Sequence, residues 1–359
     1  MTHDRPYKVA LNGYGRIGRC VLRALFERGA KAGFEIVALN DLADQASLEY
    51  LTRFDSTHGR FPGEVKVDGD CLHINGDCVK VMRSATPEGI DWAALDVDLV
   101  LECSGAYHSR VDGQRFLQAG APRVLFSQPM ASEADVDATV VYGINQHCLT
   151  GHERLVSNAS CTTNCGVPLL RVLDQAFGID YVQITTIHSA MNDQPVIDAY
   201  HQDRKSVQSV IPVSTGLARG IERLLPELAG RIQAKAVRVP TVNVSCLDIT
   251  LLTARDTSAA EVNRVLREAA LDGPPALDGP LKGLLAYTEL PHASCDFNHD
   301  PHSAIVDASQ TRVSGPRLVN LLAWFDNEWG FANRMLDVAG HYLHVVHQTA
   351  ANSPEGLHS

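Results

Sequence analysis

Apolar runs alternate with helix-like stretches along the first 160 residues, and this alternation predicts a parallel sheet covered by helices. Residues 7–12 (YKVALN) predict a buried strand, an amphipathic helix follows to about residue 28, and residues 35–40 (EIVALN) predict a second strand. A strand, a helix and a strand in this order imply a right-handed crossover between parallel strands. Further strands are expected at residues 97–102, 123–127 and 138–142. This part of the chain therefore predicts a doubly wound Rossmann domain.

The pattern changes after residue 160, where a helix over residues 161–177 precedes strands of another kind. The later strand-like runs are longer and alternate more regularly, at residues 181–187, 236–254, 304–307 and 318–325. Such alternation is typical of an antiparallel sheet with one buried face. We therefore predict an α/β chain with three parts: a Rossmann domain at 1–160 and 328–348, an α+β catalytic domain with a mostly antiparallel sheet at 161–327, and a flexible tail at 349–359.

Composition and charge limit the kinds of partner that the protein is expected to bind and the cellular compartment in which it is expected. Of the 359 residues, 45% are hydrophobic, and 31 basic against 42 acidic residues give a net charge of −11, which argues against nucleic acid or an anionic membrane as partner. No apolar run approaches the length of a membrane span, and the N-terminus lacks the apolar core of a signal peptide. Nine cysteines, an odd number, predict free thiols in a reducing compartment, so we expect a cytoplasmic protein. No group of residues has metal-ligand spacing, so no metal site is expected.

A glycine motif between the first strand and its helix predicts a dinucleotide site. Gly13, Gly15 and Gly18 form GxGxxG, which lets the backbone turn tightly and approach a pyrophosphate at the helix N-terminus. Asp41 ends the second strand, 23 residues after Gly18, where a carboxylate binds ribose hydroxyls and repels a 2′-phosphate. The alternative is a glycine turn that serves packing only. The combination favours NAD over NADP as cofactor.

The stretch SNASCTTNC predicts a nucleophilic cysteine. Ser160 is a good N-cap residue, and Cys161 then falls in the first turn of the helix, a position that lowers a thiol pKa. His188 ends the apolar strand TTIH and is the candidate partner that activates the sulfur and acts as general base. Cys165, one helical turn further on, is a weaker candidate. The alternative is a buried structural cysteine and an unrelated histidine.

Several segments together resemble the glyceraldehyde-3-phosphate dehydrogenase superfamily. They are NGYGRIGR, SNASCTTNC, TTIHSAMNDQ, RVPTVNVS and WFDNEWGFANRM, and the resemblance extends from about residue 7 to residue 348. Within the superfamily, FDSTHGRF, ATVVYGINQ and DFNHDPHSAIVDASQTRVSG are similar to the erythrose-4-phosphate dehydrogenase branch. The segment LKGLLAYTE suits the glycolytic branch equally well.

The resemblance implies NAD as cofactor, a small sugar phosphate as substrate and a homotetramer. Cys161 would attack the aldehyde, and His188 would take the hydroxyl proton as hydride leaves, which gives a thioester. Beside the glycines and Asp41, the implied cofactor contacts are Arg16, Ile17, Ser104, Gly105, Ser127 and Asn327. The implied contacts of substrate or acceptor anions are Ser160, Thr162, Arg204, Thr215, Gly216 and Arg238.

Two departures from the glycolytic pattern affect the predicted reaction. Met191 stands where that branch carries a phosphate-binding threonine, and the segment around residues 199–212 is about three residues shorter than usual. They indicate a different substrate or a different acceptor. The resemblance to the erythrose-4-phosphate branch implies oxidation of erythrose 4-phosphate to 4-phosphoerythronate, with water resolving the thioester, in pyridoxal phosphate (vitamin B6) biosynthesis. The alternatives are glyceraldehyde-3-phosphate dehydrogenase with phosphate as acceptor, and a non-catalytic NAD-binding redox sensor.

Overall fold

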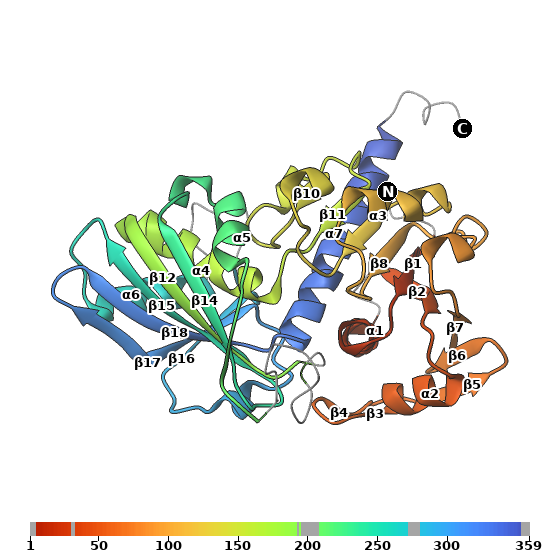
Figure 1. The fold of residues 1–359 in the computed structure, drawn as a ribbon, viewed down its shortest axis with the longest axis horizontal. Coiled ribbons are helices and arrows are strands. Elements are labelled where there is room, and N and C mark those ends of the chain that lie inside the picture. Colours follow the sequence, from red (N-terminus) through yellow and green to blue (C-terminus); the bar gives the residue numbers. More distant parts are fainter. Residues whose placement is uncertain (1–4, 30–32, 192–193, 195–207, 272–280, 353–359) are drawn as a thin grey trace. The chain divides into compact units, whose positions relative to one another are not determined.

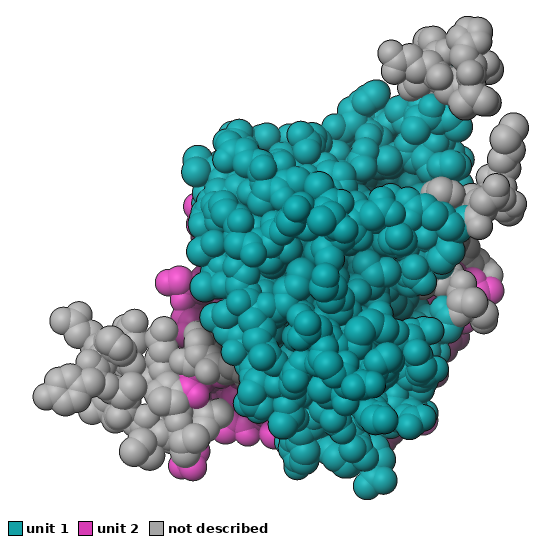
Figure 2. Space-filling model, turned by 90° about the vertical axis from the view of Figure 1, so that its right-hand side faces the viewer, with its two compact units in different colours: residues 1–159, 332–359 teal, residues 160–331 magenta. Residues whose placement is uncertain are grey.

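The computed structural model describes residues 5–29, 33–191, 194, 208–271 and 281–352 (Figure 1). The chain divides into two compact units, which are coloured separately in Figure 2. Unit 1 consists of Met1–Ala159 and Ala332–Ser359, and unit 2 consists of Ser160–Phe331. None of the helices in the described ranges has the length and apolar character needed to cross a membrane.

Unit 1 is built on a nine-stranded sheet in the order β10-β11-β9-β8-β1-β2-β7-β6-β5. All neighbours from β10 to β7 pair in parallel, and β7, β6 and β5 continue as an antiparallel extension. The strands are β1 (Tyr7–Asn12), β2 (Phe34–Asn40), β5 (Val65–Asp68), β6 (Cys71–Ile74), β7 (Asp77–Met82), β8 (Leu99–Glu102), β9 (Val124–Phe126), β10 (Ala138–Thr139) and β11 (Leu155–Ser157). A separate two-stranded ribbon joins β3 (Phe54–Asp55) and β4 (Gly59–Arg60).

The helices of unit 1 are α1 (Arg16–Arg28), α2 (Gln45–Arg53), α3 (Arg110–Gln118) and most of α7 (Trp329–Ala351). Helix α3 begins with a capping box between Ser109 and Asp112 and buries Phe116 against Trp92. The central strands are fully buried and almost wholly apolar, as expected for a parallel sheet covered on both faces. The predicted Rossmann architecture is therefore confirmed.

Unit 2 contains a seven-stranded sheet in the order β13-β14-β12-β15-β18-β17-β16. Only the pairs β12/β14 and β16/β17 are parallel, so the prediction of a mostly antiparallel sheet is confirmed. The strands are β12 (Ile179–His188), β13 (Ile211–Val213), β14 (Ile232–Arg238), β15 (Ser245–Thr253), β16 (Leu285–Thr288), β17 (Ala304–Ser314) and β18 (Leu318–Phe325). Helices α4 (Cys161–Phe177), α5 (Leu217–Leu224) and α6 (Ala259–Leu271) pack against this sheet.

Three expectations from the sequence need correction. The run 236–254 is not one strand, because the chain leaves β14 after Arg238, passes Pro240 and enters β15 only at Ser245, with Val244 in the left-handed region (φ 64°). Helix α7 continues to Ala351, so the tail is helical up to there, and residues 353–359 lie outside the described residues. Cysteines are not all free, since Cys71 and Cys78 form a disulfide between β6 and β7.

Candidate functional site

The turn from Gly13 to Gly18, here called the nucleotide turn, joins β1 to α1. A Cβ on Gly13, which has φ 89°, would lie 2.4 Å from Ser104 N, and one on Gly18 would lie 2.2 Å from Gly13 O. At Gly15, by contrast, a Cβ would meet nothing within 4 Å. Gly15 is also the N-cap of α1, so no side chain caps that helix start. Two glycines thus permit close packing, and the third leaves open space beside the N-terminus of α1, where backbone N–H groups suit a pyrophosphate.

Asp41 follows β2 at the same edge of the sheet and is held in a fixed orientation. Its Oδ2 accepts a hydrogen bond from Tyr14 N at 2.8 Å, and its Oδ1 accepts one from Ala43 N at 2.9 Å. Gly13 N donates to Asn40 O at 2.9 Å, which links the nucleotide turn to the end of β2. A carboxylate held in this way fits the hydroxyls of a ribose.

Arg16 and Ile17 form the first turn of α1, but the Arg16 side chain is already engaged. Its guanidinium forms an ion pair with Asp55 at 2.5 Å. Burial tends to raise the pKa of Asp55, but hydrogen bonds from His58 N and Arg16 outweigh it and lower that pKa to about 2. The backbone N–H groups of Arg16 and Ile17, rather than the guanidinium, are therefore the groups that suit a phosphate.

A ladder of polar side chains at the carboxyl ends of β8, β1 and β2 was missed in the sequence. Glu102 accepts hydrogen bonds from Asn12 Nδ2 and from the Ser104 hydroxyl and N–H, and Asn40 Nδ2 donates to Asn12 Oδ1 at 2.8 Å. Burial raises the pKa of Glu102 to about 7, although the bonds from Ser104 and Asn12 act in the opposite direction. The ladder fixes Ser104, and with it the loop that abuts Gly13. The signal was an acidic residue ending the apolar strand VDLVLE.

The remaining candidates of unit 1 follow the neighbouring strands. Gly105 comes after β8 in the left-handed region (φ 73°), and Ser127 follows β9 with its N–H bonded to Glu102 O at 2.9 Å. The structure therefore gathers the candidates from four segments at the carboxyl edge of β1, β2, β8 and β9. That edge is where dinucleotides bind in folds of this kind. The residues present fit NAD.

Cys161 begins α4, as the sequence predicts. Ser160 is the N-cap, and its hydroxyl accepts a hydrogen bond from Thr163 N at 3.0 Å and pairs with the Thr162 hydroxyl at 2.9 Å. The Cys161 Sγ lies 3.8 Å from His188 Nε2, at the end of β12. The helix start and the strand end thus bring together the two residues expected to perform the chemistry. With Arg238 they are called the thiol centre below.

Arg238 reaches the other nitrogen of the His188 ring. The two residues are paired in the register of the parallel strands β12 and β14, and Arg238 Nη1 lies 2.6 Å from His188 Nδ1. A guanidinium is only a donor, so Nδ1 accepts this hydrogen bond, and the ring proton then sits on Nε2, facing the sulfur. Ser189 O, at 2.9 Å from Nδ1, is the acceptor for the opposite tautomer. Nδ1 of His188 therefore has two alternative partners, Arg238 and Ser189 O. Only when Nδ1 donates to Ser189 O is Nε2 able to accept a proton.

The prediction of a lowered thiol pKa at the helix start is wrong. Burial raises the pKa of Cys161 to about 11, although a hydrogen bond from the Thr162 N–H and the charge of Arg238 act in the opposite direction. Cys165 is fully buried, and burial raises its pKa well above that of an ordinary thiol. The sulfur of Cys161 therefore depends on a nearby proton acceptor, and His188 Nε2 is the ring nitrogen beside it.

Asn327 is placed by two buried serines that the sequence did not reveal. Its Oδ1 accepts hydrogen bonds from Ser189 Oγ at 2.9 Å and from Ser245 Oγ at 2.7 Å. Asp326 accepts bonds from the N–H groups of Glu328 at 3.0 Å and Trp329 at 2.7 Å, where α7 begins. With Oδ1 oriented in this way, the Asn327 Nδ2 is the group suited to donate to a carboxamide.

The other residues expected to contact substrate or acceptor anions are Thr215, Gly216 and Arg204. Thr215 Oγ1 accepts a bond from Leu217 N at 3.2 Å, and Gly216 is the N-cap of α5. Helix α5 packs on α4, where a Cβ on Gly220 would lie 2.9 Å from the Thr163 hydroxyl. Met191 is 45% exposed, and Arg204 lies outside the described residues.

Comparison with known protein families agrees with both halves of this arrangement. Residues 7–110 match the model of the glyceraldehyde 3-phosphate dehydrogenase NAD binding domain, and residues 160–327 match the C-terminal domain of the same family. Members are NAD-dependent oxidoreductases that act on the aldehyde group of a sugar phosphate, and both matches fall on the units that carry the nucleotide turn and the thiol centre. The chain therefore belongs to the glyceraldehyde 3-phosphate dehydrogenase family.

Proposed function

We propose that this protein oxidises D-erythrose 4-phosphate to 4-phosphoerythronate, with water as the acceptor of the acyl group. The observation that carries the choice of substrate and acceptor is Met191, three residues after His188. A thioether cannot donate a hydrogen bond, so this position lacks the hydroxyl that the glycolytic branch uses to bind a phosphate. Loss of one anion subsite favours a reaction that does not need inorganic phosphate. The resemblance to the erythrose-4-phosphate branch supports the same substrate and a role in pyridoxal phosphate biosynthesis in a cytoplasmic homotetramer.

The first chemical step is attack by Cys161. With His188 in its Nδ1–H tautomer, the thiol proton passes to His188 Nε2 and the thiolate adds to the aldehyde carbon. The imidazolium returns the proton to the oxyanion, which gives the thiohemiacetal, and the Cys161 backbone N–H and the His188 ring hold its oxygen. The substrate phosphate offers Arg238 a dianionic partner, which is a stronger hydrogen-bond acceptor than a neutral imidazole. When Arg238 turns to the phosphate, the ring can change tautomer, so that its proton moves from Nε2 to Nδ1 and is donated to Ser189 O.

The second step uses the proton-accepting form of the imidazole. His188 Nε2 takes the hydroxyl proton of the thiohemiacetal while a hydride leaves the same carbon, and a thioester on Cys161 results. The chemistry that NAD would supply when bound is that of a hydride acceptor. Asn327 would hold its carboxamide through Nδ2, while the nucleotide turn and Asp41 would hold its pyrophosphate and ribose. His188 then releases this proton to solvent, and its neutral ring takes a proton from the water that attacks the thioester and passes it to the departing sulfur, which releases the acid and restores the thiol.

A two-by-two assay tests this proposal. Purified protein with NAD is given erythrose 4-phosphate or glyceraldehyde 3-phosphate, each with and without inorganic phosphate, and NADH is followed. We expect faster turnover of the tetrose, with little dependence on phosphate. Faster turnover of the triose with an absolute need for phosphate would establish the glycolytic reaction instead. No NADH from either aldehyde would favour a redox sensor.

A further inference from the structure

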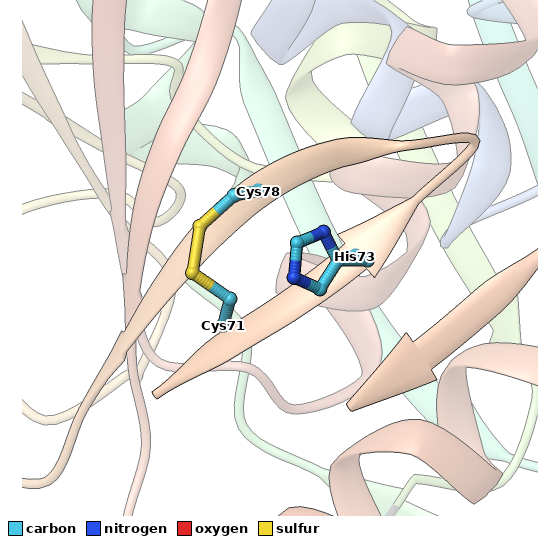
Figure 3. A group of neighbouring side chains, drawn as sticks. All are labelled: Cys71, His73 and Cys78. Atoms are coloured by element: carbon cyan, nitrogen blue, oxygen red, sulfur yellow. A yellow bond between two sulfur atoms is a disulfide. The ribbon is translucent and has the colours of Figure 1, made fainter. Parts of the chain in front are cut away.

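The hairpin β6–β7 at the end of the unit 1 sheet carries a group of ligands outside the dehydrogenase site. Cys71 and His73 are two residues apart on β6, and Cys78 lies directly opposite His73 on β7 (Figure 3). Side chains two apart on a strand, or opposite on neighbouring strands, share one face of a sheet. The sulfur and ring-nitrogen atoms all lie within 4.8 Å of one another. The sequence spacing did not suggest this cluster, because the turn of the hairpin brings its members together.

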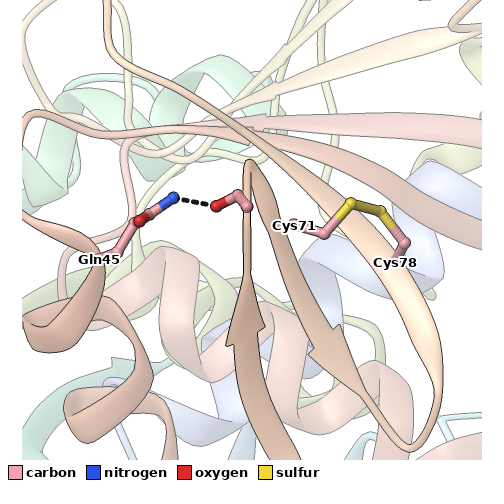
Figure 4. Close-up of a disulfide and its surroundings, with 4 residues drawn as sticks. Gln45, Cys71 and Cys78 are labelled. Atoms are coloured by element: carbon pink, nitrogen blue, oxygen red, sulfur yellow. Dashed lines mark hydrogen bonds between the residues drawn. A yellow bond between two sulfur atoms is a disulfide. The ribbon is translucent and has the colours of Figure 1, made fainter.

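The hairpin holds these three residues in a defined register. Asn75 and Gly76 form a two-residue turn with φ values of 53° and 96°, the left-handed pair that a tight hairpin requires. Leu72, Ile74 and Val79 point to the opposite face and are fully buried, which anchors the hairpin in unit 1. The turn before β6 is also fixed, because the Gln45 side chain donates a hydrogen bond to Gly69 O (Figure 4). The ligand geometry is therefore preorganised by the fold.

The sulfurs of Cys71 and Cys78 can bond either to each other or, when reduced, to a metal ion. In the structure Cys71 and Cys78 are joined as a disulfide, with their Cα atoms 5.4 Å apart. Cys78 is exposed and the other two side chains are half-buried, so a reductant or a hydrated ion can reach them. Tetrahedral zinc with two sulfur ligands and one nitrogen needs ligand atoms about 3.5–3.8 Å apart, as follows from its bond lengths. The two sulfurs are covalently joined in the disulfide and separate to this spacing only on reduction, while all three ligand atoms already lie within 4.8 Å of one another.

We propose that Cys71, His73 and Cys78 form a binding site for a thiophilic divalent cation such as zinc, open only when the disulfide is reduced. A dithiol reductant supplies two electrons and two protons to the S–S bond and becomes a cyclic disulfide itself. The cation then displaces the two thiol protons, and His73 binds through a neutral ring nitrogen. Water completes the fourth position. Lys66 and Lys80 pair with His73 and Cys71 in the strand register, and their charges favour the thiolates.

Cobalt(II) is the probe that tests this site, because sulfur-bound tetrahedral cobalt absorbs strongly. The experiment uses the full chain with Cys161→Ser, since Cys161 and His188 offer a second sulfur and nitrogen to a metal. We expect the reduced protein to bind one cobalt per chain with a thiolate charge-transfer band, and the oxidised protein to show none. Reduction without a cobalt band, or an equal band in the oxidised protein, would overturn the proposal.

Variants assign the band to the hairpin. Cys71→Ser with Cys78→Ser should abolish it, and His73→Gln should weaken cobalt binding by at least about tenfold. Cys148→Ser, which removes an exposed thiol elsewhere in unit 1, should leave the band unchanged. Circular dichroism of each variant checks that unit 1 remains folded. A band that persists in the double variant would place the metal elsewhere and contradict the proposal. None of these measurements requires dehydrogenase activity.

Discussion

The nucleotide turn and the thiol centre both lie at the start of a helix, but they are held in place differently. The nucleotide turn is fixed by backbone packing, since Gly13 and Gly18 leave no room for a side chain. The thiol centre is held by polar side-chain contacts that compete, because Arg238 and Ser189 O both lie within hydrogen-bond distance of His188 Nδ1. The first region is preorganised for its ligand, whereas the second must exchange one hydrogen bond before the imidazole can accept a proton.

The largest expected effect is on the thiol centre. Cys161→Ser should lower turnover on the order of 10⁴-fold or more, because a hydroxyl is a far weaker nucleophile than a thiolate. NAD affinity, measured by fluorescence titration, should stay the same because the nucleotide turn is untouched. Cys165→Ser is the matched control, four residues along the same helix, and should retain most of the activity. Comparable turnover in Cys161→Ser would remove the nucleophile assignment.

The next largest expected effect is on how the free energy of unfolding depends on pH, and it comes from Glu102, which supports the nucleotide turn. Its pKa is raised from 4.5 to about 7 in the folded chain, so the folded state holds this proton more tightly than the unfolded state. The resulting stability is complete below pH 4.5 and is lost as the pH rises through 7, with a magnitude of about 3 kcal/mol. Glu102→Gln should remove this dependence from the free energy of unfolding, measured by urea titration between pH 4.5 and 8.

Glu88→Gln is the control for that measurement. Glu88 is paired with Arg115, whose hydrogen bonds lower its pKa from 4.5 to about 2, so the folded and unfolded states titrate only at or below the acid edge of the same pH window. The difference between wild type and Glu88→Gln should therefore be constant from about pH 5.5 upward. If Glu102→Gln behaves in the same way, the Glu102 carboxyl does not titrate near neutrality.

Two glycine variants, with a smaller expected effect, distinguish the packing role of the nucleotide turn from its role in NAD binding. Gly18→Ala places a Cβ against Gly13 O and should destabilise unit 1 by about 1–3 kcal/mol. Gly15→Ala faces open space, so thermal stability should change little while NAD affinity falls as the methyl group meets the pyrophosphate. The rate of Cys161 alkylation should be unchanged in both variants. Equal losses of stability would contradict the different roles given to these glycines.

The smallest predicted effect concerns the serines that orient Asn327. Ser245→Ala removes one of the two donors to Asn327 Oδ1, so the KM for NAD should rise roughly tenfold, equivalent to ~1.4 kcal/mol. The KM for the aldehyde should stay constant, which a general structural defect would not allow. Ser245→Thr, which keeps the hydroxyl, should restore part of the affinity. An unchanged KM for NAD would show that Asn327 needs no such positioning.

Much of the fold was predictable because its signals are local. The ranges of β1, β18 and α4 agree with the apolar pattern and the Ser160 cap residue by residue. The hairpin β6–β7 was missed, although the sequence INGD holds the Asn-Gly pair that marks such a turn. The disulfide across it was missed for the same reason, because only the strand register brings Cys71 and Cys78 together.

The candidate site was predictable in its residue types but not in its electrostatics. The Cys161–His188 pair followed from a cap and a strand end, but the raised thiol pKa depends on burial that no local pattern reports. The contact between Arg238 and His188 Nδ1 depends on the pairing of two strands 50 residues apart. Ser189 directly follows β12 and Ser245 begins β15, and both were missed because small polar residues at buried strand ends give no distinct sequence signal.

Trapping the acyl enzyme tests the central claim most directly. Wild-type protein is mixed with NAD and erythrose 4-phosphate, quenched in acid during the first turnover and digested for mass spectrometry. We predict a burst of NADH together with the mass of the phosphoerythronyl thioester on the peptide that contains Cys161, and neither signal in Cys161→Ser. NADH formation without that adduct, or an adduct on Cys165, would contradict the account.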